Sequence, residues 1–356
     1  MTETPPGNFP PPANHPPSVK PTGDGPSDGD DLAPNPPSSD PPVRIPDPAE
    51  QFRLAAMLFV ATTLSVFYAG AFWATGEPAP DEIGQLLPYM KQGWVFAVPL
   101  LSILVCHEMG HYVAARIHRV PASPPYFLPL PVIGIFGTLG AVIAMPGRIR
   151  SRNALLDIGA AGPIAGMVVA IPVLVVGLGL SEVKELGGPG YLQEGQSLLY
   201  WAIKRAVLGP MPIGHDVILH PTALAGWAGL LITMLNLLPW GQLDGGHIAY
   251  ALFGKQHDSW APRVRQLLLV PFAYNVIQFV VPQAMGDSTL SRGDAIGNCL
   301  FWLVWYAITG GLARLSGGPE HPPFEPGKLS AWRVRVAIGC LALFIALFMP
   351  TPMAVY

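Results

Sequence analysis

Two histidines and a glutamate lie close together in one apolar stretch of the sequence, His107-Glu108-Met109-Gly110-His111. Residues four apart on a helix are rotated by only about 40° from each other, so both imidazoles can reach one metal ion. Glu108 then lies on the adjacent helix face, where a carboxylate can act as a general base beside the metal. The pattern predicts a zinc site that activates water for hydrolysis.

A third protein ligand is expected elsewhere in the chain, because a catalytic zinc ion has three protein ligands and one open position. Asp244 is the favoured candidate, since it follows a proline-interrupted apolar stretch and precedes two glycines. The glycines let the backbone bring a short side chain close to the metal. His247 and Asp157 are the alternatives: His247 could instead support the ligands, and Asp157 could cap a helix or pair with nearby basic residues.

The elements that must position these residues are membrane spans. Of the 356 residues, 50% are hydrophobic and only 12% are charged, about half the charged share of an average soluble domain. A helix needs about 20 apolar residues to cross a bilayer. Seven segments approach this length: 54–73, 95–117, 155–180, 221–238, 267–281, 296–315 and 334–349. Basic residues lie in short clusters between them rather than in one stripe, which argues against a nucleic-acid partner.

The distribution of Lys and Arg predicts which side of the membrane each loop faces. Of the 20 basic residues, 15 fall before residue 54 or within 116–152, 255–265 and 314–335, and the other 5 fall in the opposite loops. The positive-inside rule places the larger group, with the N-terminus and the opening of the active site, in the cytosol. We expect a multi-pass integral protein of the cell (inner) membrane of a prokaryote.

Residues 1–50 differ from the rest of the chain. They hold 16 of the 42 prolines, with 8 acidic and 2 basic residues, and too few apolar side chains to offset the entropy of folding. We predict a disordered cytosolic leader over 1–50 and a membrane-embedded domain over 51–350, with its catalytic core at about 95–250.

Prolines prevent the apolar segment between Arg119 and Arg148 from forming a spanning helix. We expect it to form an extended loop or a small re-entrant β-hairpin. The predicted fold class is therefore an all-α polytopic membrane protein with about six to seven transmembrane helices and this one hairpin. A strand edge here could pair with an unwound substrate, and a plug packed on the helices is the alternative. The candidate substrate-binding residues are Gly134, Phe136, Gly137, Thr138 and Gly140.

Several motifs together resemble one known family. The sequences HEMGH, PYFLPLP, GIFGTLGA, DIGAAGPIAG and HPTALAGWAGLLITMLNLLPWGQLDGGH are similar to those of the site-2 protease family of intramembrane zinc metalloproteases, over about residues 101–250. The resemblance implies one zinc ion per chain, with His107, His111 and Asp244 as ligands and Glu108 as base. It also implies that Asn236 polarises or holds the scissile carbonyl.

The expected function is zinc-dependent cleavage of peptide bonds within or near the transmembrane helix of a single-span, regulatory membrane protein. Some relatives carry a PDZ domain between the third and fourth spans, and residues 181–220 are too few for one. Two other functions stay open at this point. They are a metal-binding membrane transporter, and an inactive scaffold that binds membrane helices. The oligomeric state is not predicted.

Overall fold

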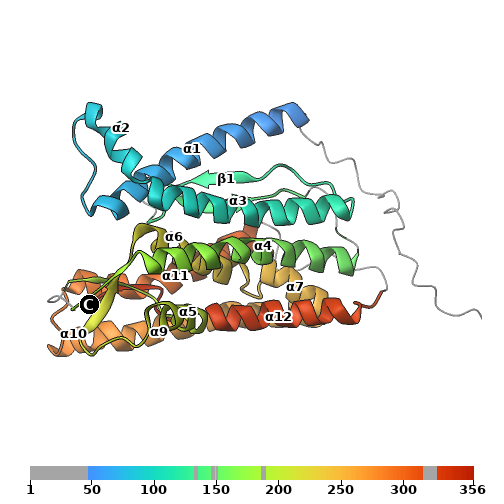
Figure 1. The fold of residues 1–356 in the computed structure, drawn as a ribbon. Helices are drawn as coiled ribbons and strands as arrows, with labels where there is room; N and C mark the ends of the chain where they lie inside the picture. The colour runs from blue at the N-terminus through green and yellow to red at the C-terminus, as the bar shows by residue number, and fades with distance from the viewer. Residues whose placement is uncertain (1–46, 132–134, 146–148, 150, 186–189, 316–326) are drawn as a thin grey trace, which may run out of the picture. The chain divides into compact units, whose positions relative to one another are not determined.

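A computed structural model describes residues 47–131, 135–145, 149, 151–185, 190–315 and 327–356. Helices dominate this part of the chain (Figure 1). They are α1 Pro48–Thr75, α2 Ile83–Gln92, α3 Trp94–Ile117, α4 Arg152–Gly179, α5 Leu198–Leu208, α6 Pro221–Asn236, α7 Asp244–Phe253, α8 Lys255–Leu267, α9 Leu269–Asn275, α10 Val281–Met285, α11 Arg292–Leu315 and α12 Ala331–Leu347, with the π-helix η1 Val276–Val280 between α9 and α10. The predicted leader falls almost wholly outside these residues and stays a prediction.

Residues with strong end-capping preferences start two of the long apolar helices, α1 and α4. The Asp47 side chain accepts a hydrogen bond from the backbone of Ala49 at the start of α1, and Pro48 occupies the first helical position. At the start of α4, the Ser151 hydroxyl accepts from the backbone of Ala154. Such caps satisfy backbone N–H groups that have no partner within the helix.

Every predicted span is helical in the structure. Five helical stretches among the described residues are long and apolar enough to cross a membrane: Pro48–Thr75, Trp94–Ile117, Arg152–Gly179, Lys255–Met285 and Arg292–Arg314. Two further predicted spans, α6 and α12, have 16 and 17 residues and fall just short of the usual spanning length. The chain is thus a mostly helical protein with membrane-spanning helices, and the count of six to seven stays a prediction.

Helix α4 is the centre of the packing. It contacts α3, α6, α7 and α12, and Figure 1 shows these helices running alongside one another. Glycines allow close approach: a Cβ at Gly177 would meet the backbone of Ala223, and one at Gly226 would meet Leu174. The start of α4 lies at the same end as the end of α3 and the start of α12 (Figure 1). These are the ends for which the basic clusters predict a cytosolic location.

The expected hairpin is present as an antiparallel pair of strands, β1 (Tyr126–Pro129) and β2 (Thr138–Val142). Phe127 pairs with Ala141 and Pro129 with Thr138, with an irregularity between these pairs. The tip is bound to α1: the Ser65 hydroxyl donates to the carbonyl of Gly137 at 2.5 Å. Proline in the segment therefore ends a strand rather than breaking a helix.

Two more strand pairs are found that the sequence did not predict. β3 (Glu182–Glu185) pairs with β5 (His215–Ile218), and β4 (Leu192–Glu194) pairs with β6 (Met353–Val355), both antiparallel. The second pair joins segments more than 150 positions apart in the chain, so no local pattern could indicate it. Each pair contacts α5 through one side chain, because Glu194 of β4 and Asp216 of β5 both bind Lys204 of α5.

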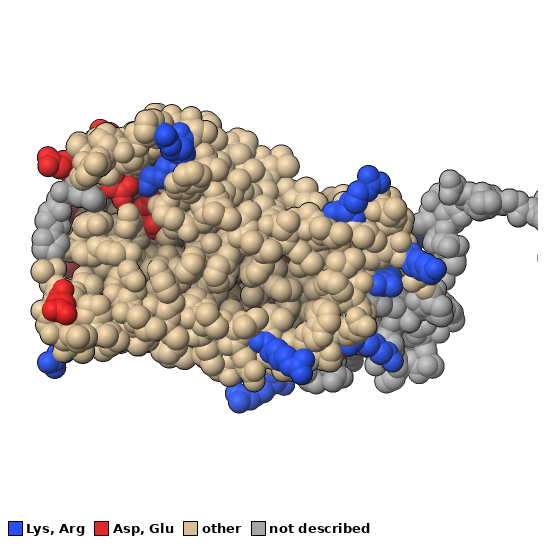
Figure 2. All heavy atoms as spheres, turned by 90° about the horizontal axis from the view of Figure 1, so that it is seen from below, with Lys and Arg blue, Asp and Glu red and all other residues tan. Residues whose placement is uncertain are grey.

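The surface shows how charge is distributed over the described part of the chain. In Figure 2 the charged side chains lie mainly towards the two ends, and the face between them is formed almost entirely by other residues. Exposed apolar side chains are common on the long helices, for example Met57 on α1 and Val168 on α4 at 65% and 69% exposed. Such a surface is suited to lipid rather than water.

Candidate metal centre

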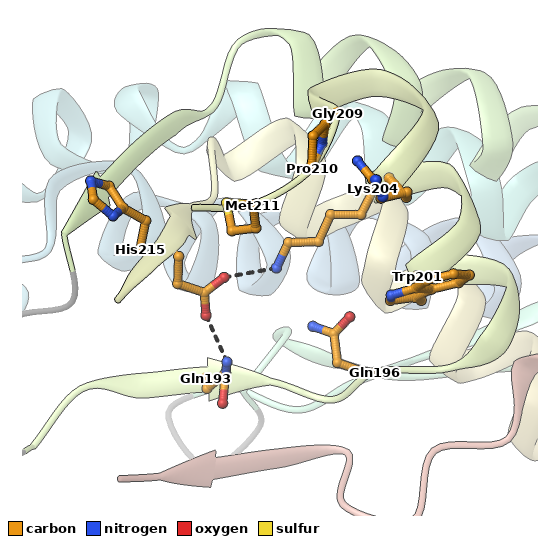
Figure 3. A pocket seen from close by; sticks show the side chains of 10 residues that line it. Gln193, Gln196, Trp201, Lys204, Gly209, Pro210, Met211 and His215 are labelled. Carbon is orange, nitrogen blue, oxygen red and sulfur yellow. Dashed lines mark hydrogen bonds and ion pairs between the residues drawn. The ribbon is translucent and has the colours of Figure 1, made fainter. Parts of the chain in front are cut away.

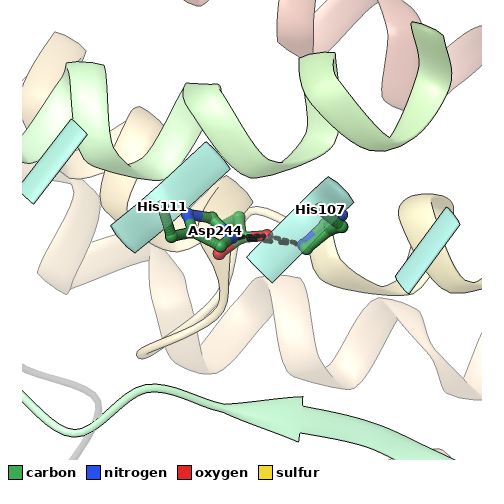
Figure 4. Close-up of side chains that lie close together, drawn as sticks. All are labelled: His107, His111 and Asp244. Carbon is green, nitrogen blue, oxygen red and sulfur yellow. Dashed lines mark hydrogen bonds and ion pairs between the residues drawn. The ribbon is translucent and has the colours of Figure 1, made fainter. Parts of the chain in front are cut away.

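Two histidines and one aspartate converge at the centre of the helices. The His107 Nε2 and His111 Nε2 atoms are 3.1 Å apart, and each lies 3.2–3.3 Å from Asp244 Oδ2. Figure 4 shows the three side chains pointing towards one another, the two histidines from α3 and Asp244 from α7. His107 and His111 are buried, and Asp244 is mostly buried.

This triangle of atoms fits a zinc ion. Bonds of about 2.0–2.1 Å to nitrogen and oxygen in a tetrahedron place neighbouring ligand atoms about 3.3 Å apart. The three observed separations of 3.1–3.3 Å match that spacing. Among the described residues, this trio is the group of His, Cys, Asp and Glu side chains whose ligand atoms lie close enough to hold a metal ion.

A backbone carbonyl of α4 orients one of the histidines. His111 Nδ1 lies 2.7 Å from the carbonyl oxygen of Ile158. A carbonyl only accepts hydrogen bonds, so Nδ1 carries the proton and the lone pair of Nε2 faces the other two ligands. Gly162 and Gly166 of α4 leave room for the two rings, because a Cβ at either position would press on His111 or His107.

The third ligand is placed by the turn that follows α6. Asp244 is the first residue of α7, and the turn before it includes Gly241 with a positive φ of 55°. Gly245 and Gly246 pack directly on the backbone of this turn, where any side chain would clash. The glycines after Asp244 therefore allow the start of α7 to pack closely on the end of α6 and the turn that follows it.

Two further predicted residues lie next to the metal ligands. The Asn236 side-chain amide, at the end of α6, lies 3.2 Å from His107 Nε2. Glu108 is only 6% exposed, and among the described residues its carboxylate has no hydrogen-bond partner. A carboxylate in that position is free to accept a proton from a water beside the ligands.

The alternative ligands have other positions. Asp157 receives hydrogen bonds from Arg333 of α12 at 2.8–3.1 Å, and its carboxylate lies 2.8 Å from His118 Nε2. It thus pairs with basic residues at the start of α4, which is the role its flanking sequence favoured. His247 lies on α7 beside Gly159 of α4, outside the trio of ligand atoms.

Four of the five candidate substrate-binding residues lie in or beside the β1–β2 pair. The Phe136 ring packs between those of Phe96 and Trp227, so its side chain is part of the helix packing. Thr138 is buried and donates to the carbonyl of Leu128 at 2.9 Å. Gly137 and Gly140 adopt positive φ values of 77° and 95°, conformations that favour glycine. Gly134 lies outside the described residues.

A second buried polar cluster lies around Lys204 of α5 (Figure 3). It is near the end of the helices that lies opposite to the start of α4 (Figure 1). Its ammonium group is 3.0 Å from both Glu194 Oε1 and Asp216 Oδ1, while Gln193 donates to Asp216 at 2.6 Å and Tyr200 to Glu194 at 2.7 Å. Burial lowers the pKa of Lys204, but the two carboxylates outweigh this and raise it above its ordinary value. Burial by itself raises the pKa of Asp216, but the hydrogen bond and charge of Lys204 outweigh this and hold the pKa below its usual range.

Comparison with known proteins agrees with the geometry. The model of Peptidase family M50 matches residues 95–276, half of the chain, and this range contains every ligand of the trio. The Arabidopsis thaliana protein named "Probable zinc metalloprotease EGY1, chloroplastic" is 37% identical over 182 residues, which are 49% of this chain and 32% of that protein. The Oryza sativa subsp. japonica protein of the same name is 36% identical over 190 residues, 51% of this chain and 31% of the relative.

A longer match is found with "Probable zinc metalloprotease EGY3, chloroplastic" of Oryza sativa subsp. indica, which is 27% identical over 305 residues, 81% of this chain and 47% of the relative. The chain thus matches about a third to a half of the length of these relatives. No solved structure matches it.

Proposed function

Because the chain belongs to peptidase family M50, the family of the site-2 proteases, we propose that it is a zinc-dependent endopeptidase that cuts membrane proteins within or near their transmembrane helices. The observation that carries the proposal is the triangle of His107, His111 and Asp244 ligand atoms, with Glu108 beside it. The two histidines lie on α3, which is long and apolar enough to cross a membrane, and Asp244 lies at the start of the short helix α7. Ligands at that depth give the site access to peptide bonds that soluble proteases cannot reach.

Each residue around the trio has a distinct proposed role in hydrolysis. Bound zinc would supply an activated water and polarise the scissile carbonyl. Glu108 accepts a proton from the water and passes it to the leaving amide nitrogen. The Asn236 amide, 3.2 Å from His107 Nε2, can donate to the carbonyl oxygen as negative charge develops there. His107, Glu108 and His111 are buried, and low exposure to bulk water strengthens each of these interactions.

The proposed substrate is a single-span regulatory membrane protein, and both enzyme and substrate are embedded in the lipid bilayer. The opening towards the cytosol is proposed from the basic clusters at the ends of α3, α4 and α12. The relatives named above are chloroplast proteins, so they give no support to a prokaryotic inner membrane, which stays a prediction.

Removing the proposed base tests the reaction itself. In the purified full chain in detergent, Glu108→Gln should lower cleavage of a single-span substrate by at least about 100-fold, because glutamine cannot accept the proton. Zinc content should not change, since Glu108 is not a ligand. Glu182→Gln, at an exposed glutamate, is the matched control and should cleave normally.

Undiminished cleavage by Glu108→Gln would contradict the mechanism. A wild-type chain that binds zinc but cuts no membrane substrate would favour the transporter or the scaffold instead. The two cases are separated by measuring zinc and cleavage on the same preparation.

We further propose that the substrate adds a strand to β2. A transmembrane helix hides its carbonyls in its own hydrogen bonds, so it must unwind before it is cut, and an open strand edge can pair with the unwound segment. Leu139 and Val142 on β2 are 63% and 52% exposed, which supports an accessible strand. Phe136, Gly137, Thr138 and Gly140 would shape this edge.

Proline scanning tests the strand. Leu139→Pro or Ala141→Pro should abolish cleavage, because proline removes a backbone donor, while zinc content and folded yield persist. Leu139→Ile is the control and should cleave almost normally, since pairing uses backbone atoms. Full activity in both proline variants would leave the segment as a packed plug.

A further inference from the structure

Arg152 joins the starting end of α4 to the final turn of α7. Its guanidinium donates from Nε to the carbonyl of Ala251 and from Nη2 to the carbonyl of Leu252, the latter at 2.7 Å. Both carbonyls belong to the last turn of a helix, where carbonyl groups lack partners within the helix. One planar side chain therefore binds two successive backbone groups, a geometry for which arginine is suited and lysine is not.

The position of Arg152 is unfavourable for its own helix. It lies in the first turn of α4, which has no acidic residue, and the positive end of a helix dipole repels a cation. Against α7 the same charge is favourable, because it lies at the negative end of that helix. The charge of Arg152 therefore stabilises the end of α7 and not the start of α4.

Helix α7 carries the third metal ligand at its other end. The helix has 10 residues from Asp244 to Phe253, so it is only about 15 Å long. It is bounded by the turn at Gly241 and by Gly254, both with positive φ. A short helix between two glycine-containing turns can shift as a rigid rod, and any shift at one end moves Asp244 at the other.

Helix α4 also holds the histidines in place. The carbonyl of Ile158 binds His111 Nδ1 at 2.7 Å, and Gly162 makes room for the same ring. The histidines and Asp244 therefore share a common reference, which is α4. Arg152 is the first residue of α4, and its bonds to the carbonyls of Ala251 and Leu252 link the position of α7 to that of α4.

We propose that Arg152 is a positioning residue for the metal site: by binding the end of α7, it holds Asp244 in register with His107 and His111. This role rests on the proposed zinc site. The three ligand atoms lie within 3.1–3.3 Å of one another, and tetrahedral coordination tolerates only small departures from that spacing.

The test measures metal binding rather than cleavage. Zinc affinity of the full-length chain in detergent is determined by competition with a chelator, and the coordination geometry is followed by the visible spectrum of the cobalt-substituted protein. Arg152→Ala should raise the zinc dissociation constant about 10- to 100-fold, the usual cost of losing a residue that orients a ligand. The cobalt spectrum should lose its tetrahedral character.

Arg152→Lys guards against a variant that fails to fold. It keeps the charge but reaches one carbonyl at most, so zinc affinity should fall between that of the wild type and that of Arg152→Ala. Arg116→Ala is the matched control, because Arg116 is an exposed arginine on the helix that carries both histidines. Its zinc affinity and cobalt spectrum should equal those of the wild type.

A purely structural role would give a different result. Folded yield and melting temperature would fall, while the folded fraction would keep its zinc affinity and cobalt spectrum. That result, with dissociation constants within about twofold of the wild type in both Arg152 variants, would overturn the role of Arg152 alone. A wild-type chain that binds no zinc would overturn the metal site and this role together.

Discussion

Two buried polar clusters in the described part of the chain contain similar groups but differ in how their charges are balanced. The Lys204 ammonium group lies 3.0 Å from each of two carboxylates. The cation that balances these carboxylates is therefore a side chain of the protein itself. Around His107, His111 and Asp244, three ligand atoms lie at similar distances and no Lys or Arg among the described residues is bound to them. The first cluster is an ion pair, whereas the second has the residue types and spacing that could hold a metal ion.

The comparison explains why similar burial leads to different expectations. A buried carboxylate is costly unless it is paired, and Lys204 pairs with both Glu194 and Asp216. Among the described residues, the Asp244 carboxylate pairs with the imidazoles of His107 and His111, which also bind metals. Proximity of acidic and basic groups is therefore weak evidence for function. A group of metal-ligand atoms that lie close together with no Lys or Arg side chain among them is stronger evidence for a functional site.

The largest expected difference between the clusters is in stability. Lys204→Met leaves the buried Glu194 and the partly buried Asp216 without their counter-ion, so the free energy of unfolding should fall by about 3 kcal/mol. Zinc content should stay unchanged. Lys184→Met is the matched control: Lys184 pairs with Glu182 at 2.6 Å, but both side chains are more than half exposed, so it should cost less than about 1 kcal/mol. Denaturation of the detergent-solubilised variants gives both numbers, and equal costs would contradict the assignment.

The pH dependence of the same measurement gives a smaller effect. The pKa of Asp216 is lowered from 3.8, so its contribution is full above pH 3.8 and is lost as pH falls through the lower folded value. The pKa of Lys204 is raised from 10.5, so its contribution is full below pH 10.5 and is lost as pH rises through the higher folded value. The stability gap between the wild type and Lys204→Met should thus be widest between about pH 4 and 10 and narrow in acid. A gap that widens below pH 4 would break the ion-pair account.

The metal centre could be predicted from the sequence because most of it is local. His107, Glu108 and His111 lie on two turns of one helix, so their spacing alone places two ligands together. The sequence favoured Asp244 over Asp157 and His247, and the packing of α7 against α4 brings its carboxylate beside the two histidines. The seven apolar segments could also be located, since length and composition determine a span.

The remaining features depend on contacts between distant segments. Glu194, Lys204 and Asp216 come from β4, α5 and β5, and their pairing follows from strand registers that no local pattern encodes. Arg152 reads in the sequence only as one member of a basic cluster. Its bonds to the carbonyls of α7 require the helix packing, because backbone acceptors carry no sequence signature.

The most direct test is zinc content per chain in two aspartate variants, measured by elemental analysis of the purified protein. Asp244→Ala removes a proposed ligand, and Asp216→Ala removes a carboxylate of equal chemistry from the Lys204 cluster. The account predicts about one zinc per chain in the wild type and in Asp216→Ala, and almost none in Asp244→Ala. Full zinc in Asp244→Ala, or its loss in a folded Asp216→Ala, would contradict the assignment of the metal centre.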